Sequence, residues 1–216
     1  MKIKELLVSL VVGVAVLLPS GIAYAVESSS SISVTSDYVF RGQTQTKNSS
    51  AIQADFLLEQ EEDKGWYTGA FASTVAKGLE FDVFAGSKGL FSKQSNMGYD
   101  VGIIRYIYTS SSFSPDITEL YAGVNYETAY IKLYNGQGSG ISSYNYLDLG
   151  ASFIVLDDLD LELHFGRYIS SPSSSDVSAN LAFDVKDFNM NLGVTYENQG
   201  VDNDVVFFVT VGKSFD

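Results

Sequence analysis

The single histidine of the chain, His164, lies in the stretch Asp160–Tyr168 (DLELHFGRY), in which apolar and polar residues alternate. Serine, asparagine and acidic residues occupy similar polar positions elsewhere, so a Ser-His-Asp or Ser-His-Asn hydrolase is one chemistry to weigh. No nucleophile signature such as G-x-S-x-G is present, and a polar group on one face of a strand explains His164 more simply. We therefore expect no catalytic residues and no enzyme.

Metal and cofactor chemistry has little support in the sequence. One histidine and no cysteine leave too few ligands for a zinc site. The acidic runs Glu59–Asp63 and Asp157–Asp160 could bind calcium, but they lack EF-hand spacing and are typical of solvated turns. The glycine-rich run Gly136–Gly140 lacks the strand–helix context of a phosphate-binding loop. We expect no metal site and no cofactor.

The ionisable residues instead recur at every second position, opposite apolar residues, as on one face of a strand. Leu161, Leu163 and Phe165, for example, alternate with Glu162 and His164. Such an apolar face can pack in the core of a soluble sandwich, or it can face lipid around a membrane barrel whose polar face lines the lumen. In the second arrangement the candidate lumen-lining residues are Asp37, Arg41, Asp55, Glu80, Asp82, Asp100, Glu119, Lys132, Asp148, Glu162, His164 and Asp184.

Alternation of this kind extends over twelve segments, and no helical stripe separates them. The first predicted strand runs through Ile32, Val34, Tyr38 and Phe40, all on its apolar face. The sequence therefore predicts an all-β, single antiparallel barrel of about twelve strands.

The predicted connections alternate in length. Glu127-Thr128 and Lys186-Asp187 are short, whereas Thr109–Asp116, Asn135–Ser143 and the serine-rich Ser170–Asp176 are longer. Short turns at one end and long loops at the other are typical of bacterial outer-membrane barrels. The short connection at Lys77-Gly78 is an exception to this rule.

Glycines and tyrosines give two further signals. Glycine weakens a strand, so its repetition on one face indicates a close approach there, as inside a closed barrel. Seven glycines share the polar face: Gly86, Gly102, Gly123, Gly150, Gly166, Gly193 and Gly212. Tyrosines near strand ends fit either the aromatic girdle at a membrane interface or packing in a core. They are Tyr106, Tyr108, Tyr126, Tyr130, Tyr134, Tyr144, Tyr146, Tyr168 and Tyr196.

Residues 1–25 have the pattern of a signal peptide: a basic start, the apolar run Leu6–Leu18 and the A-x-A site Ala23–Ala25. Cleavage leaves one barrel domain, residues 26–216, with 11 basic and 25 acidic residues and a net charge of −14. This charge argues against a nucleic-acid partner. The lack of cysteine excludes disulfides and a lipidated N-terminal cysteine.

The run Ser33–Thr46 (SVTSDYVFRGQTQT) resembles the start of the TorF-type porin family, a group also described as a domain of unknown function. The similarity continues in Gly98–Tyr108 (GYDVGIIRYIY), Thr118–Val124 (TELYAGV) and Val211–Phe215 (VGKSF). The resemblance implies a Gram-negative outer-membrane barrel of porin function and brings no catalytic residues and no known substrate. One departure is that Asp216, and not an aromatic residue, ends the chain.

The leading hypothesis is a channel in the bacterial outer membrane for passive diffusion of small solutes, with a preference for cations because the predicted lumen is acidic. Its expected partners are outer-membrane lipid, small solutes or cations, and the barrel-assembly machinery. Two alternatives remain: a barrel without a usable pore that acts as an adhesin or envelope-stabilising protein, and a soluble periplasmic carrier of lipocalin type with apolar side chains inside.

Overall fold

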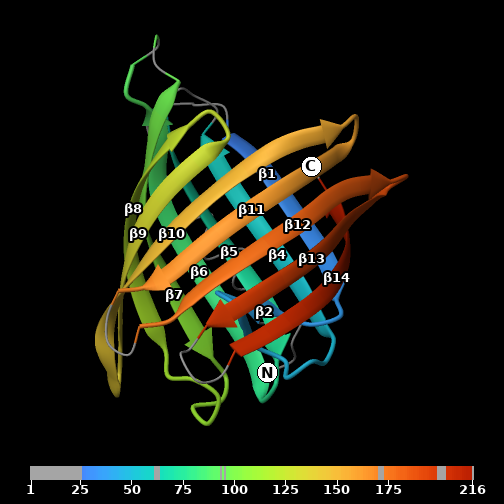
Figure 1. Ribbon diagram of the computed structural model, residues 1–216. Coiled ribbons are helices and arrows are strands. Elements are labelled where there is room, and N and C mark those ends of the chain that lie inside the picture. Colours follow the sequence, from blue (N-terminus) through green and yellow to red (C-terminus); the bar gives the residue numbers. More distant parts are fainter. Residues whose placement is uncertain are drawn as a thin grey trace.

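The computed structural model describes residues 26–60, 64–92, 94, 96–169, 173–198 and 203–215. Twelve strands close into an antiparallel barrel in which β1 pairs with both β4 and β14 (Figure 1). The barrel strands are β1 (Val26–Thr35), β4 (Ala51–Gln60), β5 (Lys64–Val75), β6 (Gly78–Leu90), β7 (Met97–Tyr108), β8 (Ile117–Tyr126), β9 (Ala129–Gly138), β10 (Ile141–Leu156), β11 (Leu159–Tyr168), β12 (Ser175–Val185), β13 (Phe188–Asn198) and β14 (Asn203–Phe215). The predicted fold is confirmed, while the predicted signal peptide lies outside the described residues.

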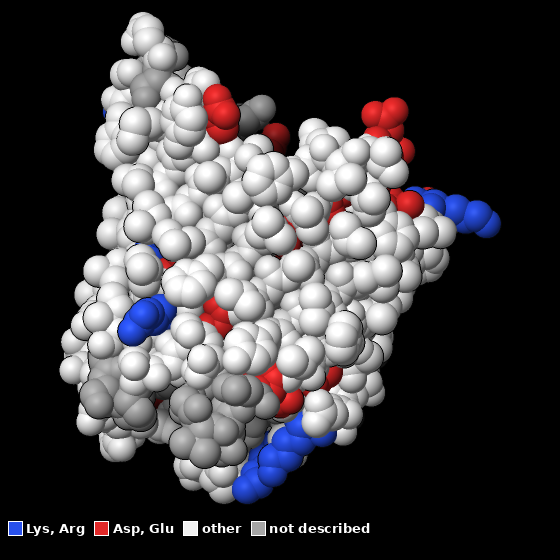
Figure 2. All heavy atoms as spheres, in the orientation of Figure 1, with Lys and Arg blue, Asp and Glu red and all other residues white. Residues whose placement is uncertain are grey.

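Side chains alternate between the exterior and the interior of the barrel. Leu120 is 56% exposed, whereas its neighbour Glu119 is 0% exposed. Phe207 and Val206 differ in the same way, at 76% and 5%. The face in Figure 2 carries few charged side chains over its middle, and most of those that are visible lie toward its edges. An apolar exterior around a polar interior is the reverse of the soluble-carrier alternative.

The two ends of the barrel differ in their connections. We call the end with the connections 36–50, 109–116 and 169–174 the loop end, and the end with the two-residue turns 127–128, 157–158 and 186–187 the turn end. The long loop predicted over Asn135–Ser143 is wrong, because β9 and β10 continue to a two-residue connection at Ser139-Gly140, where Gly140 has a φ of +81°. The connection between β5 and β6 is also only two residues long. No helix long and apolar enough to span a membrane occurs among the described residues.

Glycines on the interior face make room for aromatic rings of adjacent strands. Tyr67 lies opposite Gly86, and Tyr121 lies opposite Gly102. A methyl group on either glycine would collide with the facing ring. The same relation joins Tyr130 to Gly150, Tyr144 to Gly136 and Phe208 to Gly193. The glycine positions predicted a close approach on the interior face, and the structure shows that aromatic rings approach the backbone at these glycines.

Most of the tyrosines considered for a membrane girdle lie inside the barrel. Tyr106 and Tyr146 are buried, at 6% and 1% exposed, and Tyr134 packs its ring against Tyr146. Tyr126 and Tyr196 are exposed and fit the girdle explanation. Core packing, the alternative left open by the sequence, thus accounts for the larger group.

The first predicted strand is too long. β1 ends at Thr35, and the next residues fold into the barrel as a hairpin of β2 (Val39–Phe40) and β3 (Gln43–Thr44), which we call the inner hairpin (residues 36–50; Figure 1). Tyr38 and Phe40, predicted to face lipid, instead pack against interior rings. Period-two alternation is the same for a barrel strand and for this hairpin, so the pattern alone could not separate them.

Candidate functional site

The inner hairpin owes its shape to its own residues. Arg41 and Gly42, between β2 and β3, have φ angles of +49° and +80°, as a type I′ turn requires. At its base, the Asp37 carboxylate accepts hydrogen bonds from Thr44 at 2.5 Å and Thr46 at 2.6 Å. The turn packs closely on the barrel wall, since a Cβ on Gly42 would lie 2.7 Å from the Cβ of Asp176.

At the tip of the hairpin, Arg41 forms a two-point ion pair with Glu119 of β8. The two guanidinium nitrogens lie 2.7 and 2.9 Å from the two carboxylate oxygens. Tyr106 and Tyr144 donate to the same carboxylate at 2.9 and 2.7 Å, so Glu119 accepts four hydrogen bonds although it is fully buried. Burial opposes the charge of Arg41, but the Glu119 carboxylate holds the pKa of Arg41 well above its ordinary value.

Aromatic rings surround the same guanidinium. Its central carbon lies 4.0 Å from the centre of the Tyr146 ring, 4.8 Å from that of Phe40 and 4.9 Å from that of Tyr134. Such cation–π contacts are strongest where the cation is removed from water, as here. Together with Glu119 they fix the hairpin tip across the loop-end half of the barrel.

Further contacts fix the sides of the hairpin. Tyr38 donates to Glu80 at 3.1 Å, and Gln43 donates to Glu197 at 2.8 Å. The backbone N–H of Ala76, in the short β5–β6 connection, donates to the Gln45 carbonyl at 2.9 Å. Burial, and next the Glu80 carboxylate, raise the pKa of the Tyr38 hydroxyl, which keeps it a donor.

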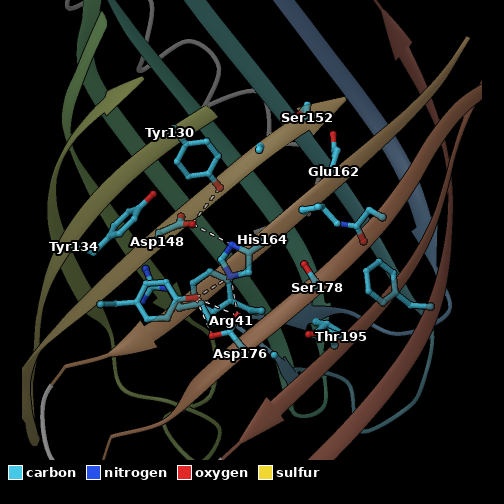
Figure 3. A pocket seen from close by; sticks show the side chains of 18 of the residues that line it. Arg41, Tyr130, Tyr134, Asp148, Ser152, Glu162, His164, Asp176, Ser178 and Thr195 are labelled. Atoms are coloured by element: carbon cyan, nitrogen blue, oxygen red, sulfur yellow. Dashed lines mark hydrogen bonds and ion pairs between the residues drawn. The ribbon is translucent and has the colours of Figure 1, made fainter. Parts of the chain in front are cut away.

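A cavity of about 490 Å³ lies between the hairpin tip and the interior faces of β9 to β14 (Figure 3). The imidazole of His164 is held there between two carboxylates, with Nδ1 3.1 Å from Asp148 and Nε2 2.8 Å from Asp176. Tyr130 donates to Asp148 at 3.1 Å, and Tyr146 donates to Asp176 at 3.0 Å. Both ring nitrogens can donate at once only when the imidazole is protonated.

A third interior cluster joins side chains of β5, β7, β8 and β9. Lys132 is 2.5 Å from one oxygen of Asp100, and Tyr67 donates to the other at 2.5 Å. Tyr67 also hydrogen-bonds Tyr121. Lys132 is therefore committed to a carboxylate, as Arg41 is.

The structure brings most of the predicted lumen residues into these groups. Arg41 and Glu119 form one pair, and Asp100 and Lys132 form another. Asp148, Glu162 and His164 line the cavity, and Asp37, Glu80 and Asp82 are buried around the inner hairpin or on β6. Asp55 and Asp184 lie apart from these groups: both are exposed, and they accept hydrogen bonds from Ser31 and Asn189. That these residues line a path for solutes remains a prediction.

Sequence reasoning missed several residues of the site. Asp176 was assigned to a serine-rich loop, although it is the second residue of β12 and contacts His164. Tyr106, Tyr144 and Tyr146 were assigned to strand ends without a facing. The available signal was their even spacing from Asp100 or Asp148 in the same strand, which predicts the same interior face.

The geometry offers little to catalysis or metal binding. Both His164 nitrogens are within hydrogen-bond distance of carboxylates, so neither is left to activate a hydroxyl nucleophile. Among the described residues, no group of three or more His, Cys, Asp or Glu side chains could hold a metal ion. The arrangement is instead that of a polar interior narrowed by a hairpin.

Comparison with known proteins agrees with the barrel fold. A family described as "Bacterial protein of unknown function (Gcw_chp)" matches residues 20–212, a description that does not carry the TorF-type name. The fold is similar to that of the KdgM porin, with a TM-score of 0.60 and 11% identity over 87% of this chain and 99% of that chain.

Two further solved structures share the fold. The NanC porin has a TM-score of 0.56 and 12% identity, and covers 88% of this chain and 100% of its own. The COG4313 outer membrane channel from Pseudomonas putida F1 has a TM-score of 0.55 and 8% identity over 92% and 100% of the two chains. No curated protein matches the chain. At such identities the likeness establishes the barrel fold alone.

Proposed function

Since the chain belongs to the Gcw_chp family of bacterial proteins of unknown function and folds as porins do, we propose that it is an outer-membrane channel for passive diffusion of small solutes, cations in preference. The observation that carries the proposal is the closed barrel with apolar side chains outside and charged side chains inside, which suits a cylinder between lipid and water. The resemblance of Ser33–Thr46 to TorF-type porins supports the same function.

In this proposal residues 1–25 direct export and are removed, and the barrel-assembly machinery inserts residues 26–216 into the outer membrane. The apolar side chains of the exterior contact lipid hydrocarbon. The turn end faces the periplasm and the loop end faces outward, as is usual for such barrels. Solutes pass the inner hairpin in the space that it leaves along the wall, so the conductance is small.

Cation preference follows from the distribution of interior charge. Three cations on the interior face are each paired with a carboxylate: Arg41 with Glu119, Lys88 with Glu59 and Lys132 with Asp100. Glu80, Asp82 and Glu162 have no cationic partner among the described residues. Uncompensated carboxylates attract cations and repel anions in a narrow pore.

The comparison with KdgM sharpens this point. One KdgM structure is described as a complex with disordered oligogalacturonate, a chain of acidic sugars. The interior of the present barrel offers carboxylates where such a ligand would require cations. We therefore propose small cations and uncharged solutes, and not acidic oligosaccharides, as the solutes of this channel.

Planar-bilayer recording on the purified, refolded barrel tests the proposal. With a KCl gradient across the bilayer we expect small, discrete conductance steps and a reversal potential of the sign that indicates K⁺ selectivity. Absence of conductance would favour the adhesin or envelope-stabilising alternative, and anion selectivity would refute the charge argument. Outer-membrane fractionation with heat-modifiable gel migration tests the location separately.

A further inference from the structure

The cavity beside the inner hairpin has the size of a small-molecule site. Its volume of about 490 Å³ lies within the range of about 300–1,000 Å³ that ligand pockets occupy. The hairpin residues Phe40 and Arg41 form one boundary, and the interior faces of β9 to β14 form the other (Figure 3). A solute could therefore reside here as well as pass through.

Carboxylates outnumber cations around this cavity. Both terminal nitrogens of Arg41 are engaged by Glu119, so Arg41 has no charge to spare for a solute. His164 lies between Asp148 and Asp176, and a single imidazolium can balance only one of the two. The wall is consequently negative whether or not His164 is protonated.

Glu162 is the carboxylate on this wall that is open to a solute. It lines the cavity, is exposed, and has no hydrogen-bond or ion-pair partner within the part of the chain that the structure describes. The register places Ser152 and Asn180 on either side of it, on β10 and β12. Ser178 and Thr195 stand opposite each other in the next row, on β12 and β13, so acceptor oxygens surround the carboxylate.

Aromatic surface completes the cavity. The rings of Tyr130 and Phe208 belong to its lining, each covering a glycine of the adjacent strand. A bare inorganic cation would gain little from these rings, whereas a hydrocarbon segment next to a positive head group can pack on them. An uncharged polyol would use the hydroxyl groups but would leave Glu162 without a counter-charge.

We propose that this cavity binds small organic cations that carry a primary ammonium group, with the Glu162 carboxylate as the anchor. The ammonium group has three N–H donors, which suit Glu162 and the neighbouring hydroxyl and amide oxygens. The short hydrocarbon chain of the solute packs against Tyr130 and Phe208. The inference rests on the proposed function, because it names the class of solute that the channel would hold on its path.

Three four-carbon probes of matched length test the proposal: 1,4-diaminobutane, 1,4-butanediol and succinate. Binding to the refolded full barrel in detergent is measured by ligand-observed NMR and calorimetry at low salt. We expect saturable binding of the diamine, at least tenfold weaker binding of the diol and none of succinate. Equal affinity for diamine and diol, or no binding of the diamine, would overturn the proposal.

Variants locate the anchor. Glu162→Gln should weaken diamine binding about tenfold, whereas Glu162→Asp, which keeps the charge, should retain most of the affinity. Asp157→Asn removes the same charge from the exposed β10–β11 turn, outside the cavity, and should leave the affinity unchanged. If Glu162→Gln and Asp157→Asn lowered the affinity for the diamine equally, the net charge of the barrel would explain the loss, and Glu162 would not be a specific anchor.

Binding and conduction are measured independently, so the two proposals can fail separately. A barrel that conducts K⁺ but does not bind the diamine refutes the site and leaves the channel. A barrel that binds the diamine through Glu162 but passes no current refutes the channel and leaves a ligand site inside a closed barrel.

Discussion

The two halves of the barrel interior both carry inward-facing carboxylates, but Glu119 in the loop-end half is paired with a buried cation, whereas Glu162 in the turn-end half lines a cavity. In the loop-end half, the chain supplies its own counter-ion: Arg41 enters from the inner hairpin and saturates Glu119, and aromatic rings cover the pair. In the turn-end half, Glu162 faces a cavity with no such partner among the described residues. The difference teaches that alternation sets which side chains point inward, while a separate segment decides whether the space they face is filled.

The largest expected effect comes from removing the filling segment. Replacing residues 37–49 by a short Gly/Ser turn, together with Glu119→Gln so that no carboxylate is left without Arg41, should be tolerated, because Thr35 and Ala51 already pair at the adjoining ends of β1 and β4. We expect the single-channel conductance to rise severalfold, since the loop-end half would no longer be narrower than a twelve-stranded barrel allows.

Bilayer recording of the deletion variant beside the unaltered barrel measures this change. A matched control removes the exposed residues Ser111 and Ser112 from the loop 109–116, which should leave the conductance nearly unchanged. An unchanged conductance in the hairpin deletion would mean that the inner hairpin does not limit the path.

The second largest effect concerns the stability of the filled half. Glu119→Gln leaves the Arg41 guanidinium buried without its carboxylate, and breaking a buried pair from one side costs about 3–5 kcal/mol. Unfolding in denaturant, followed by tryptophan and tyrosine fluorescence in detergent or vesicles, would report the loss.

The double variant Arg41→Gln with Glu119→Gln provides the control. It leaves no unpaired charge, so it should be less destabilised than the sum of its single variants. Additive losses would mean that Arg41 and Glu119 contribute through separate contacts and not as a pair.

The sequence predicted the barrel well because its exterior obeys one rule. Leu120, Phe207 and their counterparts must lie outside if Glu119 and Val206 lie inside, and a slip of one residue would reverse every such position. The prediction of a barrel with apolar residues outside therefore rested on many strands at once and did not depend on any single strand.

The inner hairpin could not be predicted by the same rule. Its residues continue the alternation of β1, and what distinguishes it is the turn at Arg41-Gly42 and the pairing of Arg41 with Glu119, 78 positions along the chain. The turn itself carries only a weak signal, because Gly42 suits a tight hairpin turn but Arg41 is not one of the residues that usually precede glycine there. The ion pair depends on closure of the whole barrel, which alternation does not specify.

A smaller effect of opposite sign is expected beside the hairpin, at two buried carboxylates of β6. Glu80 and Asp82 are 2% and 7% exposed, each has an oxygen without a hydrogen-bond partner, and neither forms an ion pair among the described residues. Two neighbouring buried carboxylates repel each other when both are charged. Asp82→Asn should therefore raise the free energy of unfolding by about 1–2 kcal/mol at pH 8.

The gain should shrink at pH 5, because the free energy needed to protonate a carboxylate, and so to relieve the repulsion in the unaltered barrel, falls as the pH falls. Denaturant unfolding at both pH values measures the difference. A loss of stability of similar size at both pH values would show that the Asp82 carboxylate satisfies a contact that an amide cannot.

The smallest effect is expected at the turn-end rim, where an ion pair meets solvent. Lys88 and Glu59 form this pair, but their side chains are 53% and 27% exposed, so water screens the attraction. Lys88→Ala should cost no more than about 1 kcal/mol in denaturant unfolding, and the cost should fall as salt is added. The pair of Arg41 and Glu119 should show little salt dependence, because both groups are removed from water. If the two pairs responded equally to salt, the loop-end half would have to be hydrated, and its description as a filled half would fail.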